Sequence, residues 1–154
     1  MYRIRLYKQE DCNEVVSLFY NTVHSVNKKD YTTEQLDAWA PADLDFERWN
    51  RILSQNYTII VEKEGVIKGF GDIDATGYFD HLFVHKDHQG QGIATLIKEK
   101  IEKHALDANM QRVTVAASIT ARPFFEKHGY TVLKEQRVER NGQTLINYFM
   151  EKFL

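Results

Sequence analysis

The apolar residues of this chain recur with two different periods, and the order of these periods restricts the fold. Residues 2–6 alternate apolar and charged side chains, which is the period of a strand with one buried face. Between residues 11 and 26 they recur every three or four positions, as in an amphipathic helix, and Asp11 and Glu14 have the spacing of a capping box. Continued along the chain, the pattern predicts a strand, three helices, three strands, a helix, a strand, a helix and two strands. This order predicts one α/β domain, residues 1–154, with a mixed twisted sheet of about seven strands and helices on both faces.

Turn and capping residues separate the other elements. Thr32 and Gln35 have capping-box spacing before a short helix that Pro41 ends. Asn141-Gly142 is the preferred turn pair of a β-hairpin, here between strands at 130–139 and 143–152. The remaining elements are expected at residues 46–53, 57–62, 66–75, 78–84, 93–104, 113–116 and 120–128.

Length and composition limit the class of protein. The 154 residues fit one domain, and 43% hydrophobic residues suffice for a core, which excludes a disordered chain. Twenty basic against 22 acidic residues leave a formal net charge of −2, so no overall positive field favours nucleic acid or an anionic membrane. Cys12 is the only cysteine, which excludes an internal disulfide and indicates a reducing compartment. Without a signal-peptide pattern or an apolar run of the ~18 residues of a membrane helix, we expect a cytoplasmic protein with no nucleic-acid or membrane partner.

A loop with two glycines joins the strand at 78–84 to the helix at 93–104. Gly90 and Gly92 let a ligand approach the backbone closely, and the free amides of a helix N-terminus favour anions such as phosphates. The loop is not a Walker A loop, because no Gly-Lys-Ser/Thr follows the glycines. It is not a Rossmann fingerprint either, because the third glycine is missing. Two glycines can also simply make a tight turn, so the assignment needs further residues.

Two segments resemble motifs of the GNAT superfamily of N-acetyltransferases. Gln89-Gly90-Gln91-Gly92-Ile93-Ala94 resembles motif A, Gln/Arg-x-x-Gly-x-Gly/Ala. The stretch from Ser118 to Tyr130 resembles the signature Asn-x-x-Ala-x-x-Phe-Tyr-Glu-Lys-x-Gly-Phe, and it keeps Ala121, Phe124, Glu126, Lys127 and Gly129. The predicted order of elements follows the GNAT fold from the first strand to the final hairpin. Within the superfamily, residues 30–41 resemble the small bacterial YafP-type acetyltransferases.

The resemblance implies acetyl-CoA as co-substrate. The acetyl group would pass directly to a primary amine of a small molecule or peptide in a ternary complex, without a metal. The family's contacts imply that the backbone of residues 82–84 pairs with the pantetheine arm and that amides from Gly90 to Thr95 bind the pyrophosphate. Ser118 stands where the family usually has Asn, and Phe125 where many members have the Tyr that protonates the leaving thiolate. The cofactor-binding residues implied in this way are Leu82, Phe83, Val84, Gln89, Gly90, Gln91, Gly92, Ile93, Ala94, Thr95, Ser118 and Phe125.

The acceptor amine needs a group that removes its proton, because an alkylamine with a pKa of about 10.4 is mostly charged at neutral pH. Family members often place an acidic base near the middle of the strand at 78–84, which makes Asp80 the first candidate and His81 the second. Strict alternation puts these two residues on opposite faces, so both cannot line one pocket unless a bulge re-aims one of them. Tyr148 on the final strand is a candidate substitute acid.

Other residues are candidates for the acceptor side. Asp72 and Asp74 form either an acidic lining that favours cationic amines or an exposed strand face. Aromatic residues in the helical region that covers the acceptor site in the family are candidates for shaping the pocket, although such spacing also suits a hydrophobic core. These residues are Tyr20, His24, Tyr31 and Trp39. The histidines at 81, 85 and 88 span a strand and a loop rather than one helical face, so we expect no metal site.

Two other functions stay open. The Phe125 departure is also compatible with a CoA or acyl-CoA binding module without transferase activity. Alternatively, the glycine loop serves another phosphate ligand, or only the fold, in an interaction protein, which predicts no binding of CoA. The sequence does not identify the amine acceptor. The final hairpin offers a sheet edge through which a homodimer could form.

Overall fold

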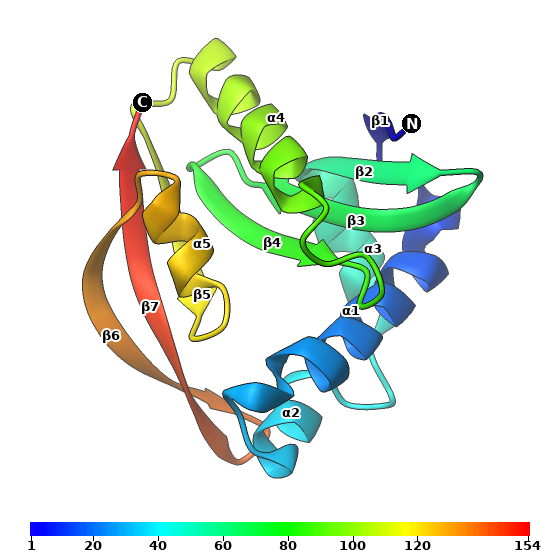
Figure 1. The fold of residues 1–154 in the computed structure, drawn as a ribbon, viewed down its shortest axis with the longest axis vertical. Coiled ribbons are helices and arrows are strands. Elements are labelled where there is room, and N and C mark those ends of the chain that lie inside the picture. Colours follow the sequence, from blue (N-terminus) through cyan, green and yellow to red (C-terminus); the bar gives the residue numbers. More distant parts are fainter.

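A seven-stranded sheet in the order β1-β2-β3-β4-β5-β7-β6 forms the centre of the computed structural model, which describes residues 1–154 (Figure 1). All neighbouring strands are antiparallel except β4 and β5, so the sheet is mixed, as predicted. The strands are β1 (Arg3–Leu6), β2 (Tyr57–Lys63), β3 (Val66–Ile73), β4 (Tyr78–Val84), β5 (Arg112–Ser118), β6 (Thr131–Arg140) and β7 (Gln143–Phe153). The helices are α1 (Cys12–Val26), α2 (Thr33–Trp39), α3 (Phe46–Gln55), α4 (Ile93–Asp107) and α5 (Arg122–Lys127), with short 3-10 turns η1 (Gln9–Asp11) and η2 (Asn27–Lys29).

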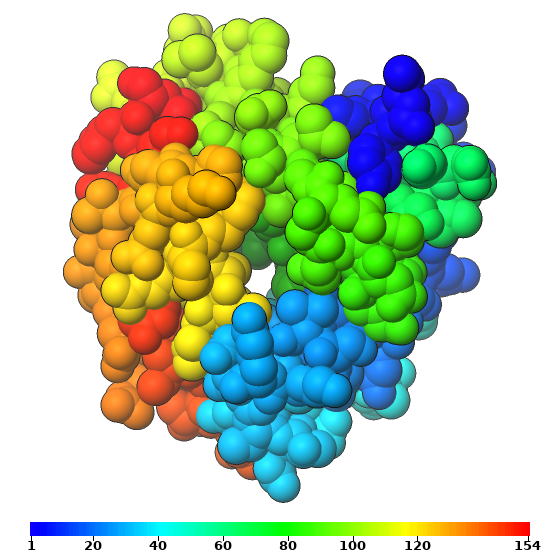
Figure 2. Space-filling view, viewed as in Figure 1, coloured from blue at the N-terminus to red at the C-terminus, as the bar shows by residue number.

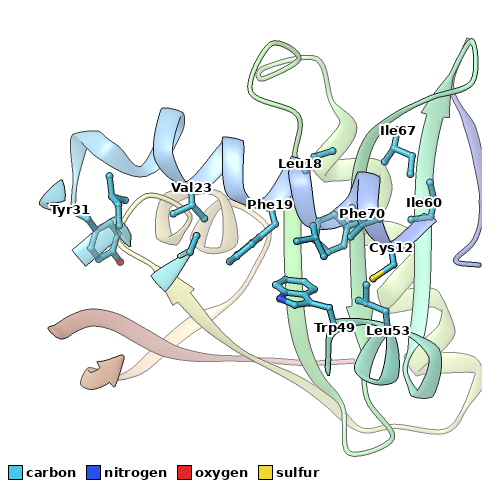
Figure 3. Close-up of a cluster of buried hydrophobic side chains, with 14 of the residues drawn as sticks. Cys12, Leu18, Phe19, Val23, Tyr31, Trp49, Leu53, Ile60, Ile67 and Phe70 are labelled. Atoms are coloured by element: carbon cyan, nitrogen blue, oxygen red, sulfur yellow. The ribbon is translucent and has the colours of Figure 1, made fainter. Parts of the chain in front are cut away.

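Helices cover both faces of the sheet, and each buries its own apolar stripe. On one face, α1, α2 and α3 enclose a core in which Phe19 and Trp49 meet at 4.7 Å between ring centroids (Figure 3). On the other face, α4 packs closely on β3 because Gly69 and Gly71 have no side chains. A Cβ at Gly71 would lie 2.5 Å from Ile97. None of the helices combines the length and apolar character that crossing a bilayer requires.

The two expected capping boxes have different outcomes. The box at the start of α2 is confirmed, because the Gln35 N–H donates to Thr32 Oγ1 at 3.1 Å and the Thr32 N–H to Gln35 Oε1 at 2.9 Å. The box at the start of α1 is wrong. Asp11 instead binds the guanidinium of Arg5, and Glu14 accepts a hydrogen bond from the Ile67 N–H of β3. Both carboxylates therefore tie α1 to the sheet, which the local spacing does not reveal.

The sheet divides between its two parallel strands. β4 pairs with β5 only through Tyr78 opposite Thr114 and Phe79 opposite Val115, and beyond these pairs the strands diverge (Figure 1). The space-filling view shows the surface hollowed at this division, between the β5–α5 segment and the loop before α4 (Figure 2). One edge of residues 80–84 therefore has no strand partner.

A β-bulge interrupts the other edge of β4. Ile73 of β3 lies opposite Phe79, whereas Asp72 lies opposite His81, so Asp80 is an extra residue in β4. A bulge breaks the strict alternation of side chains between the two faces. This is the exception under which Asp80 and His81 can share one pocket.

Candidate active site

The division between β4 and β5 opens into a cavity of about 1600 Å³. All of β4 lines it, together with the glycine loop, the C-terminal half of β5, α1, α3 and the end of the β6–β7 hairpin. Every residue expected to bind the cofactor lines this cavity except Gln91, whose side chain accepts a hydrogen bond from the Tyr2 hydroxyl. The cavity thus joins the glycine loop to the middle of β4.

The glycine loop presents a run of free amides to the cavity. Gly90 and Gly92 have positive φ angles of 72° and 84°, in the left-handed region that suits glycine. The backbone N–H groups from Gln89 to Gly92 donate to no protein acceptor, and the first residues of α4 have no intrahelical acceptor. The Gln89 side chain donates to the Val84 carbonyl at 2.7 Å and so holds the loop against β4. Free amides at the start of a helix favour an anion such as a pyrophosphate.

The unpaired edge of β4 offers further backbone groups. The His85 N–H donates to the Lys68 carbonyl of β3. In an antiparallel ladder, successive residues direct their N–H and C=O groups alternately toward and away from the neighbouring strand. Because His85 faces β3, Leu82 and Val84 face away from it. The N–H and C=O of Leu82 and the N–H of Val84 therefore point toward the division between β4 and β5. The Val84 carbonyl is already used, because it accepts hydrogen bonds from Thr22 Oγ1 and the Gln89 side chain. An extended ligand can therefore pair with this edge as a strand would.

Ser118 and Phe125, the two departures from the family signature, line the cavity on the side formed by β5 and α5. The Ser118 hydroxyl accepts a hydrogen bond from the Ala121 N–H at 3.0 Å and keeps its own proton for another acceptor. Phe125 is 2% exposed, and its ring packs edge-on against Phe79 and Tyr130. This position therefore supplies apolar surface and no proton.

Three polar side chains, from β4, β3 and the end of α3, are linked by hydrogen bonds. His81 Nδ1 lies 2.8 Å from Asp72 Oδ1, and the Asn56 side chain donates to Asp72 Oδ2 at 2.9 Å. Asp72 is fully buried, so it is neither of the expected alternatives, an acidic cavity lining or an exposed strand face. Asp74 lies outside the cavity, where its carboxylate accepts hydrogen bonds from Thr76 and from the Tyr78 N–H.

Charge and burial act in opposite directions on His81. Burial lowers the pKa of His81, but the charge of Asp72, its hydrogen bond and the charge of Asp80 outweigh burial and raise it above the usual 6.5. The Asp80 carboxylate lies 3.8 Å from His81 Nδ1, and the pKa of Asp80 is raised mainly by burial. The bulge thus brings both predicted proton acceptors into one electrostatic unit.

His81 keeps one nitrogen free. Its Nε2 has no hydrogen-bond partner in the protein. Every buried side-chain nitrogen and oxygen has such a partner, so Nε2 is not among the buried atoms. Nε2 is therefore accessible, and His81 lines the cavity. Asp72, Asp80 and His81 also have ligand-type atoms within 4.8 Å of one another, but hydrogen bonds already occupy both Asp72 oxygens. The arrangement is an Asp–His pair with the second imidazole nitrogen facing the cavity.

The other predicted residues are divided between the cavity and its surroundings. Tyr31 and Trp39 line the cavity, whereas Tyr20 and His24 do not. The rings of Tyr20 and His24 instead pack against each other in a tilted arrangement, with their centroids 4.3 Å apart. The Tyr31 hydroxyl donates to the Ile146 carbonyl and accepts from the Ile119 N–H, so it joins the α1–α2 region to β5 and β7.

Tyr148 also lies outside the cavity. Its ring packs against the guanidinium of Arg122 on α5, and its hydroxyl lies 3.4 Å from the Glu135 carboxylate. Because of the register between β5 and β7, Tyr148 lies opposite Ala117, on the α5 side of the sheet. Sequence reasoning missed Asn56 and the buried role of Asp72, because neither residue has a local signal for its contacts.

Known proteins are similar to this chain in both sequence and fold. Residues 27–152 match the acetyltransferase (GNAT) domain. The chain is 33% identical over 150 residues to the uncharacterized N-acetyltransferase YafP of Escherichia coli K12, covering 96% of this chain and 93% of YafP. A GCN5-related N-acetyltransferase from Rhodopseudomonas palustris shares 33% identity and a TM-score of 0.95 over 99% of this chain and 95% of its own.

A more distant structure has the same fold. The PaiA N-acetyltransferase of Thermoplasma acidophilum, in complex with coenzyme A, gives a TM-score of 0.82 at 13% identity, covering 100% of this chain and 99% of its own. The family match spans most of the chain, and the full-length relatives agree with it. The chain therefore belongs to the GNAT family of acetyl-CoA-dependent N-acetyltransferases.

Proposed function

We propose that this protein passes the acetyl group of acetyl-CoA directly to a primary amine while both are bound in the one cavity. The observation that carries the proposal is that one cavity is lined both by the glycine loop with its free amides and by His81, whose Nδ1 is bonded to the buried Asp72. The loop suits the pyrophosphate, and the unpaired edge of β4 suits the pantetheine arm. Acetyl-CoA placed in this way brings its thioester toward the middle of β4.

The proposed reaction needs a neutral amine and a polarised carbonyl. A backbone N–H on the free edge of β4, at Leu82 or Val84, polarises the thioester carbonyl as the amine attacks. The carbon–nitrogen bond forms, the carbon–sulfur bond breaks, and the amine proton passes to His81 Nε2. The buried Asp72 stabilises the imidazolium that results, and the Asp80 carboxylate attracts the incoming ammonium group.

The leaving group needs no acid at Phe125. A thiol pKa of about 8.5 makes the thiolate a fair leaving group without protonation. The same side chain favours a second candidate function, a CoA-binding module without transferase activity. That module would bind acetyl-CoA and leave every amine unmodified.

We expect the protein to be cytoplasmic, consistent with its one free, buried cysteine, Cys12.

Calorimetric titration with acetyl-CoA, with ATP and NAD as controls, tests the cofactor. A Cβ at Gly92 would meet no atom within 4 Å, so Gly92→Ala adds only the strain of a positive φ and a methyl group at the anion site. Gly65, in the turn between β2 and β3, has a φ of 77° and equally open space, and it lies outside the cavity. Gly65→Ala is therefore the matched control for backbone strain.

We expect binding of acetyl-CoA alone, weakened at least tenfold in Gly92→Ala and unchanged in Gly65→Ala. Release of the free thiol in the presence of an amine panel then tests transfer. Equal affinity in both glycine variants would remove the loop from the site. Binding without thiol release against any amine would favour the module.

A further inference from the structure

Two arginine side chains reach the cavity from the two arms of the divided sheet. Arg48 lies on α3, which packs on the arm that contains β2, and Arg140 ends β6 on the other arm. Both line the cavity, and neither forms an ion pair with a carboxylate of the chain. Arg140 donates one hydrogen bond to the Glu139 carbonyl, which leaves most of its guanidinium donors free.

The charges of the two guanidinium groups act on residues of β4. The charge of Arg48 acts on both Asp80 and His81, and the charge of Arg140 acts on Tyr78, two residues before Asp80. Tyr78 lines the cavity, and its hydroxyl has no hydrogen-bond partner in the protein. Because every buried polar side-chain atom has a partner, this hydroxyl is accessible. Arg48, Tyr78 and Arg140 therefore bring free hydrogen-bond donors into the cavity that Asp80 and His81 also line.

Most acidic residues at this end of the cavity already have partners. Asp45 accepts a hydrogen bond from the Arg48 N–H, Glu139 accepts one from the Thr144 hydroxyl, and Asp37 lies 3.9 Å from His24. Glu34 and Asp43 are exposed, as are Arg48 and Arg140. Beside the Asp72–His81 pair, the free donors belong to arginine and tyrosine.

We propose that the acceptor carries a carboxylate on the same molecule as its amine, as in an amino acid or a related zwitterion. Asp80 and His81 receive the amine, while Arg48, Arg140 and the Tyr78 hydroxyl receive the carboxylate. Arginine suits this task because its planar fork of donors matches a carboxylate. A bare amine would pair with Asp80 and His81 but would leave the two guanidinium groups without an anion. The inference rests on the proposed acetyl transfer and adds the class of acceptor.

Matched acceptor pairs of similar amine basicity test the inference. Initial rates of thiol release from acetyl-CoA give kcat/KM for 5-aminopentanoate against pentylamine, and for 4-aminobutanoate against butylamine. We expect at least one carboxylated member to react about tenfold or more faster than its partner, as is typical of a hydrogen bond to a charged group. Arg48→Ala and Arg140→Ala should lose this preference through a higher KM for the carboxylated amine.

Two other arginines provide the control variants. Arg51 on α3 and Arg137 on β6 form no ion pair and lie outside the cavity. Arg51→Ala and Arg137→Ala should keep the preference. Equal use of both members in every pair, or a preference that survives both Arg48→Ala and Arg140→Ala, would overturn the inference and leave acetyl transfer intact. Acetyl transfer to no amine at all would remove the proposed function and the inference together.

Discussion

Replacing Asp72 with asparagine removes the buried charge beside His81 while keeping the size of the side chain. Asp72 is fully buried, and its carboxylate contacts only His81 and Asn56 among side chains. The introduced amide can accept the Asn56 donor with its oxygen and turn its own N–H₂ toward His81 Nδ1. That geometry favours the tautomer with the proton on Nε2, which cannot accept a proton from the amine.

The expected size of the effect follows from the contact that is lost. A hydrogen bond to a charged group contributes about 1.5–3 kcal/mol. At about 1.36 kcal/mol per unit, its loss should lower the pKa of His81 by about 1–2 units. Because His81 accepts the proton in its neutral form in the proposed reaction, the acidic limb of the kcat/KM profile should move to lower pH by the same amount. The plateau should fall about tenfold or more, because the less basic imidazole has the wrong tautomer.

Folding stability provides a second measurement with a defined sign. The pKa of His81 is raised in the folded state, so its contribution to stability is fully present below the ordinary value of 6.5 and is lost as the pH rises through the folded-state pKa. The difference in unfolding free energy between the wild type and Asp72→Asn should therefore be largest below pH 6.5. It should shrink above the folded-state pKa. Urea titrations at several pH values measure it.

Asn56→Ala is the control for loss of packing and hydrogen bonding near Asp72. It removes the partner of Asp72 Oδ2 but keeps the carboxylate, so the pKa of His81 should stay above 6.5. Titration of the His81 ring protons by NMR measures this pKa in all three proteins. An unchanged His81 pKa in Asp72→Asn would refute the electrostatic reasoning, whatever the change in rate.

Three further substitutions test other parts of the site. Asp80→Asn should raise KM for the amine and lower the pKa of His81, since the Asp80 charge raises that pKa; steady-state kinetics and NMR titration measure the two effects. Tyr31→Phe leaves the Ile119 N–H and the Ile146 carbonyl without a partner, at a cost of about 1–3 kcal/mol. Calorimetry should show a Tm lower by about 2–4 °C for each kcal/mol lost. Tyr148→Phe should leave kcat unchanged, because this hydroxyl lies outside the cavity, and a tenfold fall would restore Tyr148 as an acid.

Local sequence patterns were sufficient to predict the helices, the strands and the glycine loop. The stripe of Ile93, Ile97 and Ile101 is fully buried, as its helical spacing predicts, and the positive φ angles of Asn141 and Gly142 confirm the hairpin turn. These features depend on residues a few positions apart, so the chain specifies them before it folds. The same holds for Gly90 and Gly92, whose backbone angles few other residues adopt.

Alternation failed at Asp80, because a bulge is a property of two paired strands. Phe79 is fully buried against the α4 face and His81 lines the cavity on the other side, so the extra residue between them is accommodated by the register with β3. No pattern within β4 alone contains that register. A prediction from one strand therefore separates two side chains that the sheet brings to within 3.8 Å.

Sequence patterns were enough to predict the order of strands and helices, the mixed sheet and the glycine loop that marks the family. The proposed proton-transfer site exists only after folding, because Asn56 lies at a helix end and Asp72 and His81 lie on two neighbouring strands. Folding likewise places Tyr148 toward α5 and brings Arg48 and Arg140 to one cavity. Periodicity records which side chains are buried, whereas contacts between distant segments depend on strand register and helix packing, which no local pattern encodes.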